Sequence, residues 1–373
     1  MLSATCPDRV LGDLCGNYNP PIDTDILVIG AGPAGLSVGY ELSTRGAAYR
    51  IVEQGPAAGF SWLSMQEKLK LLSPWKVDKL FGTRGRVAPR HALVSRAVYS
   101  AYLAQYAQYH RLALATGVQV KGVRAVAGGF AVETSRGEER ARRVVNATGY
   151  FFNPRLPHLL GEDTSAIPRL HAAAYYNPDT VRALARGGRR VLVLGKGITA
   201  GQVATELHDA GFAVFISHRA PIRFARDPWI LAIAFHFFYA YENVRVRLDP
   251  YYRVDSFPPM EGGYTRTLIE SGRIGTRPDI RRLAADKVEF VDGRAEAFDV
   301  LVYATGYRPA LSHLAGLVKV DPASGLPKTQ GGFESTDAPG LFFLGLDKQR
   351  TYRSRYLRGI REDAAALAEL LTR

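Results

Sequence analysis

The chain has 373 residues, of which 47% are hydrophobic and 22% charged, and its formal net charge is +13. This length allows two domains, and the composition is that of an ordinary globular protein. Arginine is spread along the chain without a basic tail, so we predict no nucleic-acid partner. The two cysteines, Cys6 and Cys15, form no CxxC motif, which argues against a dithiol relay and a cysteine-rich site. No metal site is predicted.

The start of the chain shows no targeting pattern. No positively charged segment leads into an apolar run, and no apolar run approaches the length of a transmembrane helix. Residues 1–23 hold several prolines and glycines and are predicted to be an irregular lead-in. Because so few cysteines suit a reducing compartment, we expect a cytoplasmic protein without membrane contact.

The first strong motif is a strand followed by three glycines. Residues 26–29 form an aliphatic run typical of a strand buried on both faces, and residues 36–45 are predicted to form a helix. Between them, Gly30 makes a tight turn, Gly32 admits a pyrophosphate close to the backbone, and Gly35 lets the helix pack on the strand. The unpaired N–H groups at the helix start favour a diphosphate anion.

An acidic residue completes this motif. A second apolar strand, 48–52, ends in Glu53 roughly twenty residues after the turn, where a carboxylate can bond a ribose. A glycine fingerprint alone is a weak signal. Strand, glycines, helix, strand and acid in this order predict a dinucleotide site.

The chain then continues through a loop-like region and a further strand. The predicted elements are a loop over 56–82, a helix over 95–112, an antiparallel pair over 118–126 and 129–135, and a strand over 143–146 that ends in Ala147-Thr-Gly149. Pro154 and Pro157 mark a linker.

The opening pattern returns after this linker. The predicted elements are a strand over 190–194, a turn Gly195-Lys-Gly197-Ile-Thr-Ala-Gly201, a helix over 202–210, and a strand over 213–217 ending in His218-Arg219. A later strand, 299–303, ends in Ala304-Thr-Gly306 and repeats the earlier Ala-Thr-Gly. A helix over about 356–371 closes the chain.

Two fingerprints and two Ala-Thr-Gly ends predict an α/β fold with two Rossmann-like dinucleotide-binding domains, the second inserted into the first. The predicted boundaries are 24–155 for the first part of the first domain, 156–300 for the inserted second domain, and 301–373 for the return of the first domain.

The two sites differ where specificity is set. Glu53 after the first fingerprint favours a free ribose hydroxyl pair, so we assign FAD there. Arg219 stands after the second fingerprint, with Arg223 and Arg226 nearby, and can pair with a 2′-phosphate, so we assign NADPH there. The alternative is that Arg219 is a solvated charge at a strand end.

Further motifs strengthen this pattern: Glu53 followed by Gly59-Phe-Ser-Trp62, Asn146-Ala-Thr-Gly-Tyr150, Ala304-Thr-Gly-Tyr-Arg-Pro309 and Pro339-Gly-Leu-Phe-Phe-Leu-Gly345. With these motifs the chain, from about residue 24 onward, resembles the class B flavin-dependent monooxygenases, which include flavin-containing, YUCCA-like, N-hydroxylating and Baeyer–Villiger enzymes. The resulting cofactor-binding candidates are Gly30, Gly32, Pro33, Ala34, Gly35, Glu53, Gln54, Trp62, Thr148, Gly149 and Gly345 for FAD, and Gly195, Gly197, Ile198, Thr199 and Arg219 for NADPH.

The resemblance implies a mechanism. NADPH reduces FAD, oxygen adds to give a C4a-(hydro)peroxyflavin, and one oxygen atom reaches a small organic substrate. The protein must exclude water until the substrate arrives. Trp62 and Trp75 could line such a space, or could be plain core aromatics.

The chain departs from the family between its two domains. The family pattern FxGxxxHxxx plus an aromatic residue keeps His171 and Tyr175 here, and we take both as catalytic candidates, but Ser165 and Ile167 replace its Phe and Gly. An ordinary linker histidine is an equal alternative for His171. The segment around Leu72-Ser-Pro-Trp75 also lacks the Asn that many N-oxygenating members have.

Residues 229–241 are apolar except for His236. We favour a wall of an apolar substrate pocket, and a helix dipping into a membrane or covered by a partner subunit are the alternatives. The sequence leaves the oligomeric state open, and a homodimer is compatible with it.

The leading hypothesis is therefore an FAD- and NADPH-dependent monooxygenase that acts on a small organic substrate with O2. A flavin or quinone reductase without oxygen insertion is the second hypothesis, and a non-catalytic redox sensor is the third.

Overall fold

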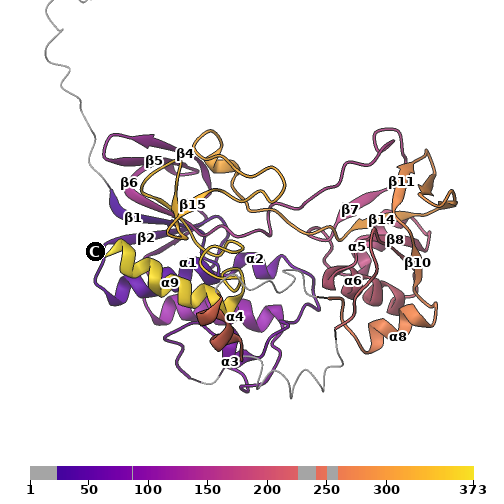
Figure 1. Ribbon diagram of the computed structural model, residues 1–373, viewed down its shortest axis with the longest axis horizontal. Helices are drawn as coiled ribbons and strands as arrows, with labels where there is room; N and C mark the ends of the chain where they lie inside the picture. The colour runs from indigo at the N-terminus through magenta and orange to yellow at the C-terminus, as the bar shows by residue number, and fades with distance from the viewer. Residues whose placement is uncertain (1–22, 86, 226–240, 250–258) are drawn as a thin grey trace, which may run out of the picture.

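The computed structural model describes residues 23–85, 87–225, 241–249 and 259–373. The chain forms two lobes, each built around its own sheet (Figure 1). The predicted lead-in over 1–22 and most of the apolar stretch over 229–241 lie outside the described residues.

The first lobe contains a mainly parallel sheet in the order β17-β6-β1-β2-β3. Its strands are β1 (Thr24–Ile29), β2 (Tyr49–Glu53), β3 (Leu114–Thr116), β6 (Gly137–Asn146) and β17 (Leu341–Phe343). The antiparallel strands β4 (Val120–Val126) and β5 (Gly129–Thr134) extend from β6, and β15 (Thr329–Gln330) and β16 (Glu334–Ser335) extend from β17.

Helices α1 (Pro33–Thr44), α4 (Arg96–Tyr109) and α9 (Leu357–Leu371) cover one face of this sheet (Figure 1). Their apolar side chains share one buried cluster with alternate residues of the strands, among them Ile26, Val28 and Ile51. Leu27 and Ile29 face the opposite side and pack beneath β4 and β5. The strand is thus buried on both faces, as its unbroken aliphatic run predicted.

The second lobe contains a five-stranded parallel sheet in the order β10-β9-β8-β14-β7. Its strands are β7 (Arg169–His171), β8 (Arg190–Leu194), β9 (Ala213–Ser217), β10 (Gly275–Arg277) and β14 (Val300–Tyr303). Around it lie α5 (Pro178–Ala185), α6 (Ile198–Asp209), α8 (Tyr264–Glu270) and the antiparallel strands β11 (Ile280–Leu283), β12 (Lys287–Phe290) and β13 (Ala295–Ala297). Residues 241–248 form a further helix, which contacts the first lobe although it lies within the predicted 156–300 domain: Glu242 accepts hydrogen bonds from Arg358 on α9 at 2.7 and 2.6 Å.

The second lobe is inserted between β6 and β17, which are neighbours in the first sheet. The fold therefore confirms two Rossmann-like units with one inserted into the other. The predicted boundary after residue 300 is wrong in detail, because β14 spans Val300–Tyr303 and pairs with β8 and β7. Strand β14 belongs to the second sheet, and the chain returns to the sheet of the first lobe only after it.

Several predicted elements change their bounds. Helices α1 and α6 begin at Pro33 and Ile198, inside the glycine turns rather than after them. The region 56–82, predicted as a loop, contains two short helices, α2 (Phe60–Leu63) and α3 (Trp75–Asp78). Strand β6 begins at Gly137 instead of residue 143, because its first half pairs with β5.

Candidate functional site

The first glycine turn lies where β1, β2 and β6 end together. Ile29 is in register with Val52 and with Asn146, so three strands end at one edge. Gly30 has φ +101, and a Cβ there would lie 2.8 Å from the carbonyl oxygen of Ala147. The close approach and the left-handed backbone both require glycine.

The helix that follows leaves its first N–H groups uncapped. Gly32 is the N-cap of α1 and supplies no side-chain cap, and Pro33 occupies the first turn. Apart from its chain neighbours, no atom of the described part of the chain lies within 4 Å of the position that a Cβ on Gly32 would take, so the helix end faces open space there. Gly345 lies beside this turn, 3.4 Å from the Ala34 side chain by the same measure. This cradle fits a diphosphate.

Glu53 braces the turn. Its carboxylate is buried and accepts hydrogen bonds from Ala31 N at 2.7 Å and Gly55 N at 2.9 Å, one on each oxygen. The predicted ribose contact would use the remaining lone pairs of the same carboxylate. Gln54, the next residue, is exposed.

The Ala-Thr-Gly segment and α2 surround the same edge. Thr148 donates its hydroxyl hydrogen to the Ala310 carbonyl at 2.7 Å, and Gly149 has φ +67. Gly59 N donates to Ala31 O at 2.9 Å, which brings the start of α2 to the turn. Trp62 on α2 is partly buried and meets Tyr99 edge-on, with ring centroids 4.7 Å apart.

Two buried polar atoms at this edge have no hydrogen-bond partner among the residues that the structure describes: Asn146 Nδ2 and Asp347 Oδ1. Asn146 Oδ1 is occupied, because it accepts from His313 Nε2 at 2.8 Å. Asp347 N donates to the Tyr150 hydroxyl at 2.8 Å. Unpaired buried polar groups call for a partner, and hydroxyls or ring nitrogens of a flavin nucleotide would supply one. Neither residue was predicted as a site residue, although Asn146 opens the motif Asn146-Ala-Thr-Gly-Tyr150 and Asp347 lies two residues after Gly345.

The second glycine turn repeats the first. Gly195 has φ +147, and a Cβ there would lie 2.5 Å from the Ala304 carbonyl oxygen. Gly195 N donates to Ser217 O at 3.0 Å, as Gly30 N donates to Val52 O at 2.8 Å. Gly197 is the N-cap of α6 and supplies no side-chain cap, and no atom of the described residues beyond its chain neighbours lies within 4 Å of its Cβ position. Ile198 and Thr199 form the first helical turn.

The position equivalent to Gly35 is Ala200, not Gly201. Gly201 faces away from the turn, and its Cβ would lie 2.6 Å from the Met260 side chain. The second fingerprint is therefore of the G-x-G-x-x-A form. The predicted turn, which extended to Gly201, is therefore wrong at its last residue.

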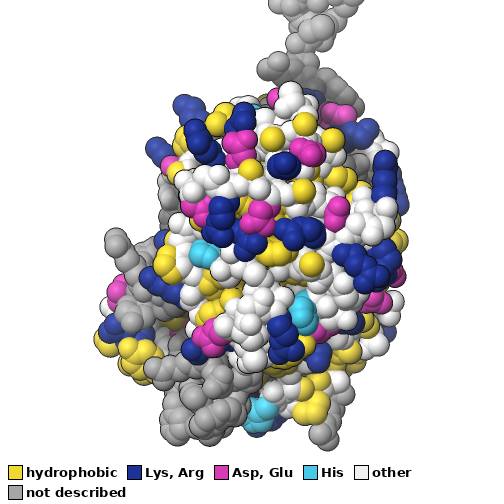
Figure 2. Space-filling view, turned by 90° about the vertical axis from the view of Figure 1, so that its right-hand side faces the viewer, with side chains coloured by type: hydrophobic (Ala, Val, Ile, Leu, Met, Phe, Trp, Pro, Cys, Tyr) yellow, Lys and Arg dark blue, Asp and Glu magenta, His cyan; other side chains and the backbone are white. Residues whose placement is uncertain are grey.

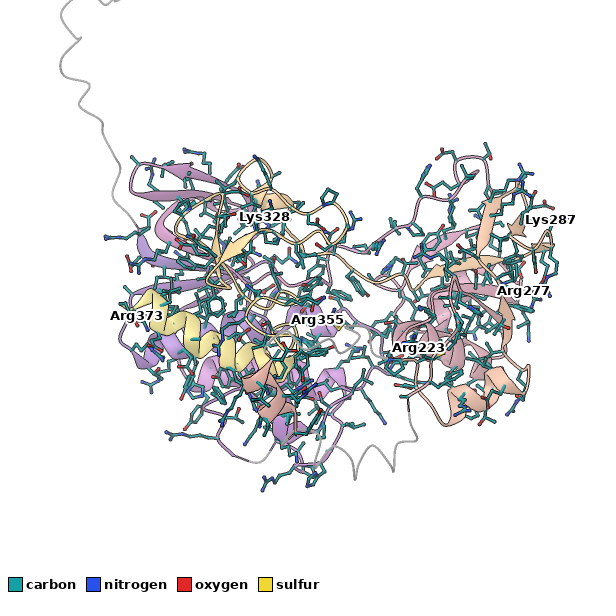
Figure 3. All side chains as sticks on the ribbon, viewed as in Figure 1. Arg223, Arg277, Lys287, Lys328, Arg355 and Arg373 are labelled. Atoms are coloured by element: carbon teal, nitrogen blue, oxygen red, sulfur yellow. The ribbon has the colours of Figure 1, made fainter. Side chains whose placement is uncertain are left out.

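Arg219 follows β9 and is exposed. It makes no hydrogen bond or ion pair with any residue that the structure describes. Arg277, on the neighbouring strand, is instead held by Glu296 at 2.6 and 2.9 Å. Figure 3 shows Arg223 on the side of the second lobe that faces the first lobe, and Arg277 at the opposite edge. Arg219 is thus a cation with no protein partner in the described chain beside the second turn.

His171 lies at the same edge of the second sheet. It ends β7, in register with Tyr303, and its ring meets Tyr307 edge-on at 5.1 Å. Its Nδ1 accepts from Ala173 N at 3.0 Å. Burial lowers the pKa of His171, and a contact with the Gly306 backbone opposes the shift. Burial therefore favours the neutral form of the His171 imidazole, which lies next to the crossover between the lobes.

An aromatic series continues from Tyr307 into the first lobe. Phe151 lies 5.8 Å from Tyr307 and 5.2 Å from Phe152, and Phe152 stacks 6.2 Å from Phe60 on α2. Burial raises the pKa of Tyr307 to about 12. An apolar, aromatic strip therefore joins the two fingerprint edges.

Tyr175 does not belong to this junction. It is fully buried in the core of the second lobe, and its hydroxyl donates to Glu206 on α6 at 3.0 Å. Burial raises its pKa well above the ordinary value, and Glu206 adds to the shift. This placement favours a packing role over a catalytic one. Trp75 is likewise a core residue, packed edge-on against Tyr102.

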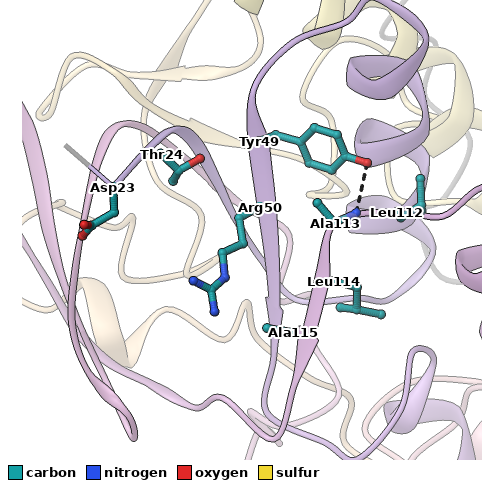
Figure 4. Close-up of a pocket in the computed structure, with 8 residues that line it drawn as sticks. All are labelled: Asp23, Thr24, Tyr49, Arg50, Leu112, Ala113, Leu114 and Ala115. Carbon is teal, nitrogen blue, oxygen red and sulfur yellow. Dashed lines mark hydrogen bonds between the residues drawn. The ribbon is translucent and has the colours of Figure 1, made fainter.

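A surface hollow lies elsewhere on the first lobe (Figure 4). It is lined by Asp23, Thr24, Tyr49, Arg50 and Leu112 to Ala115, at the amino ends of β1 and β2. Nucleotides bind at the carboxyl ends of the strands in open α/β sheets. The hollow is therefore not the cofactor site.

Positive charge is dispersed over the second lobe. Seen end-on in Figure 2, Lys and Arg side chains alternate with Asp and Glu. In the described part of the chain, no helix has both the length and the apolar character needed to cross a bilayer.

The family model for pyridine nucleotide-disulphide oxidoreductases matches residues 27–233, which include both glycine turns. The chain belongs to this family. The match confirms the α/β fold and, with the two fingerprints, a flavin and a nicotinamide nucleotide as the cofactors. The family is named for disulphide chemistry, but this chain has no CxxC motif, the pattern expected for a redox-active dithiol.

Individual relatives cover nearly the whole chain. An uncharacterized oxidoreductase, CzcO-like, from Geobacillus kaustophilus is 28% identical over 92% of this chain and 97% of that protein. The indole-3-pyruvate monooxygenase YUCCA4 from Oryza sativa is 25% identical over 91% of this chain and 85% of that protein. These relatives agree with the resemblance to class B flavin-dependent monooxygenases.

Solved structures agree in fold. A flavin-containing monooxygenase from Stenotrophomonas maltophilia has a TM-score of 0.78 and 26% identity, covering 94% of this chain and 98% of that chain. The bacillithiol disulfide reductase from Bacillus cereus has a TM-score of 0.70 at 20% identity, covering 94% of this chain and 98% of that chain. The second likeness shows a shared fold alone.

Proposed function

We propose that this protein is an FAD- and NADPH-dependent monooxygenase that transfers one atom of O2 to a small organic substrate. The observation that carries the proposal is the pair of uncapped glycine turns joined by the aromatic strip at His171 and Tyr307. The similarity to flavin-containing and indole-3-pyruvate monooxygenases supports the same class. The sparse cysteines favour the cytoplasm as its location.

FAD fits the first lobe. The uncapped start of α1 would hold its diphosphate, Glu53 its ribose, and Asn146 and Asp347 would partner its remaining polar groups. When bound, the flavin accepts hydride from a nicotinamide and activates oxygen.

NADPH fits the second lobe. The uncapped start of α6 would hold its diphosphate, and Arg219, which has no partner in the described chain, its 2′-phosphate. His171 remains neutral near pH 7, so it can donate one hydrogen bond without supplying a mobile proton. The aromatic strip would exclude water from the space between the lobes.

The decisive experiment measures both oxygen transfer and coupling. The purified flavoprotein is screened with NADPH, 18O2 and a library of small amines, sulfides and carbonyl compounds. We expect a substrate that accelerates NADPH oxidation and gains one 18O atom. Rapid NADPH oxidation that yields only peroxide, or only a reduced quinone, with every compound would instead show a reductase. No oxidation of NADPH would show a nucleotide-binding sensor.

A further inference from the structure

Arg96 is a buried arginine at the first position of α4, only 6% exposed. It is charged, yet its hydrogen-bond partners are backbone carbonyls and a phenol. Its guanidinium donates to the carbonyl of Leu63 at 2.8 Å and to that of Glu67 at 3.3 Å. A longer contact of 3.5 Å reaches the carbonyl of Trp62. Arg96 thereby fixes the loop that leaves α2, on the flavin side of the molecule.

The same guanidinium reaches across to the second lobe. Arg96 Nη2 donates to the Tyr176 hydroxyl at 2.7 Å, and the guanidinium lies 5.0 Å from the centre of the Tyr176 ring. Arginine can donate several hydrogen bonds from a planar guanidinium and contact an aromatic ring at the same time, whereas lysine cannot.

Two more hydrogen bonds surround this contact. Glu67 N donates to the Tyr176 carbonyl at 2.7 Å. Asn177 Nδ2 donates to Glu67 Oε2 at 3.0 Å, while Asn177 Oδ1 caps α5 by accepting from Asp179 N. We call Arg96, Glu67, Tyr176 and Asn177 the interdomain latch.

The latch holds the far end of a short turn that begins at His171. Residues 171–177 connect β7 to α5, and His171 touches Tyr307 at the near end. The turn is therefore fixed at one end to the crossover and at the other to the loop that follows Trp62. This loop follows α2, and the start of α2 bonds to the first turn through Gly59 N and Ala31 O, so the latch relates the position of one nucleotide site to the other through α2.

We propose that Arg96 is a positioning residue that sets the approach of the nicotinamide to the flavin by holding Tyr176 against the loop after α2. This inference rests on the proposed function for its kinetic consequence. Its structural part, the latch between the lobes, can be measured without catalysis.

The sharpest test reverses one hydrogen bond at the latch. Asn177→Asp places a carboxylate against Glu67, while Asp is as good an N-cap as Asn and keeps α5 intact. Adding Glu67→Gln restores a donor and an acceptor in the opposite order. Tyr176→Phe keeps the ring beneath Arg96 and removes only the hydroxyl. These variants avoid Arg96→Ala, which would leave buried carbonyls unpaired and threaten folding.

The first readout is hydrogen exchange of the backbone amide of residue 67 in the flavin-loaded protein. This amide donates directly to the Tyr176 carbonyl in the second lobe. We expect roughly tenfold faster exchange in Asn177→Asp, a smaller increase in Tyr176→Phe, and recovery in the double variant. Unchanged exchange in both single variants would overturn the latch, whether or not NADPH reduces the flavin.

The second readout is anaerobic flavin reduction by NADPH. We expect the limiting rate to fall roughly tenfold in Asn177→Asp with NADPH affinity nearly unchanged, because misplacement affects the transfer more than binding. The double variant should recover the rate. Faster exchange with an unchanged rate would overturn the positioning role. A wild-type flavin that NADPH does not reduce would instead overturn the proposed function, leaving the exchange result to decide the latch.

Discussion

The two glycine turns share a backbone plan and differ in what stabilises them. In both, the first glycine approaches an Ala-Thr-Gly carbonyl and the second is an uncapped N-cap. In the first turn, a Cβ on Gly35 would lie 1.8 Å from the Gly30 carbonyl oxygen. In the second turn this position is Ala200, which fits and is fully buried.

The braces differ as well. Glu53 ties the first turn to the end of β2 through two backbone amides. The equivalent residue in the second turn is His218, whose Nδ1 contacts the Ala220 carbonyl at 3.1 Å instead. The first turn is therefore tight and internally braced, whereas the second lacks such a brace and has Arg219 beside it, without a partner among the described residues. The difference suits a resident nucleotide in the first lobe and an exchanging one in the second.

The largest effect should come from exchanging the third positions. Gly35→Ala forces a methyl group into a backbone oxygen, and we expect a loss of more than about 3 kcal/mol of unfolding free energy together with the flavin. The matched variant Ala200→Gly should cost only about 1 kcal/mol and keep the flavin. Urea unfolding and flavin absorbance measure both. Equal losses in the two variants would contradict the distinction between the turns.

Removing the brace should rank second. Glu53→Gln offers one acceptor and one NH2 group to two backbone donors, so a buried N–H loses its partner at a cost of about 2 kcal/mol. Flavin affinity, measured by fluorescence titration, should fall with it. His218→Gln at the equivalent position is the control and should leave flavin affinity as in the wild type.

Arg219 should affect one cofactor only. Arg219→Ala removes an exposed cation, so the apparent affinity for NADPH should fall roughly tenfold while that for NADH stays the same. Initial rates with each nucleotide measure the change. A wild-type preference for NADH, or equal losses for both nucleotides, would show that Arg219 is a solvated charge.

The smallest expected effect at neutral pH is a change in the pH dependence of unfolding, and it concerns His313 beside the end of β6. Asn146 at this end accepts a hydrogen bond from His313, whose pKa burial lowers from 6.5 to about 4. Below pH 6.5 the unfolded chain binds the proton more readily than the folded chain, so the free energy of unfolding falls as the pH drops from 6.5 to 4. His313→Gln keeps the donor and should flatten this slope in denaturant titrations. An unchanged slope would assign it to other groups, of which His171 is one.

Much of this arrangement could be predicted from local sequence. The strands, the glycine turns and the Ala-Thr-Gly ends are each marked by a few adjacent residues. Gly30 and Gly195, for example, are required because a Cβ there would collide with a backbone carbonyl. The insertion of one domain into the other followed from the order of the motifs. The predicted helix starts, at residues 36 and 202, were too late. The helices begin at Pro33 and Ile198, within the glycine turns.

Tertiary contacts explain the failures. Tyr175 and His171 stand four residues apart in one turn, yet one enters the core of the second lobe and the other the junction. Nothing local distinguishes them. Asn146 and Asp347 emerged only once their unpaired buried atoms were visible, and Arg96 only once its partners in both lobes were known.

The crossover between the lobes has a consequence for construction. The outgoing and returning segments bond to each other: Arg155 N donates to Gly306 O and Arg308 N to Asn153 O, both at 2.9 Å. The entry and exit of the inserted domain are thus adjacent. Exchange of this domain must also preserve the helix over 241–248, because Glu242 accepts hydrogen bonds from Arg358 on α9 at 2.7 and 2.6 Å. Within the described residues, the two lobes are therefore joined at three places: the crossover, the interdomain latch, and the contact of Glu242 with Arg358.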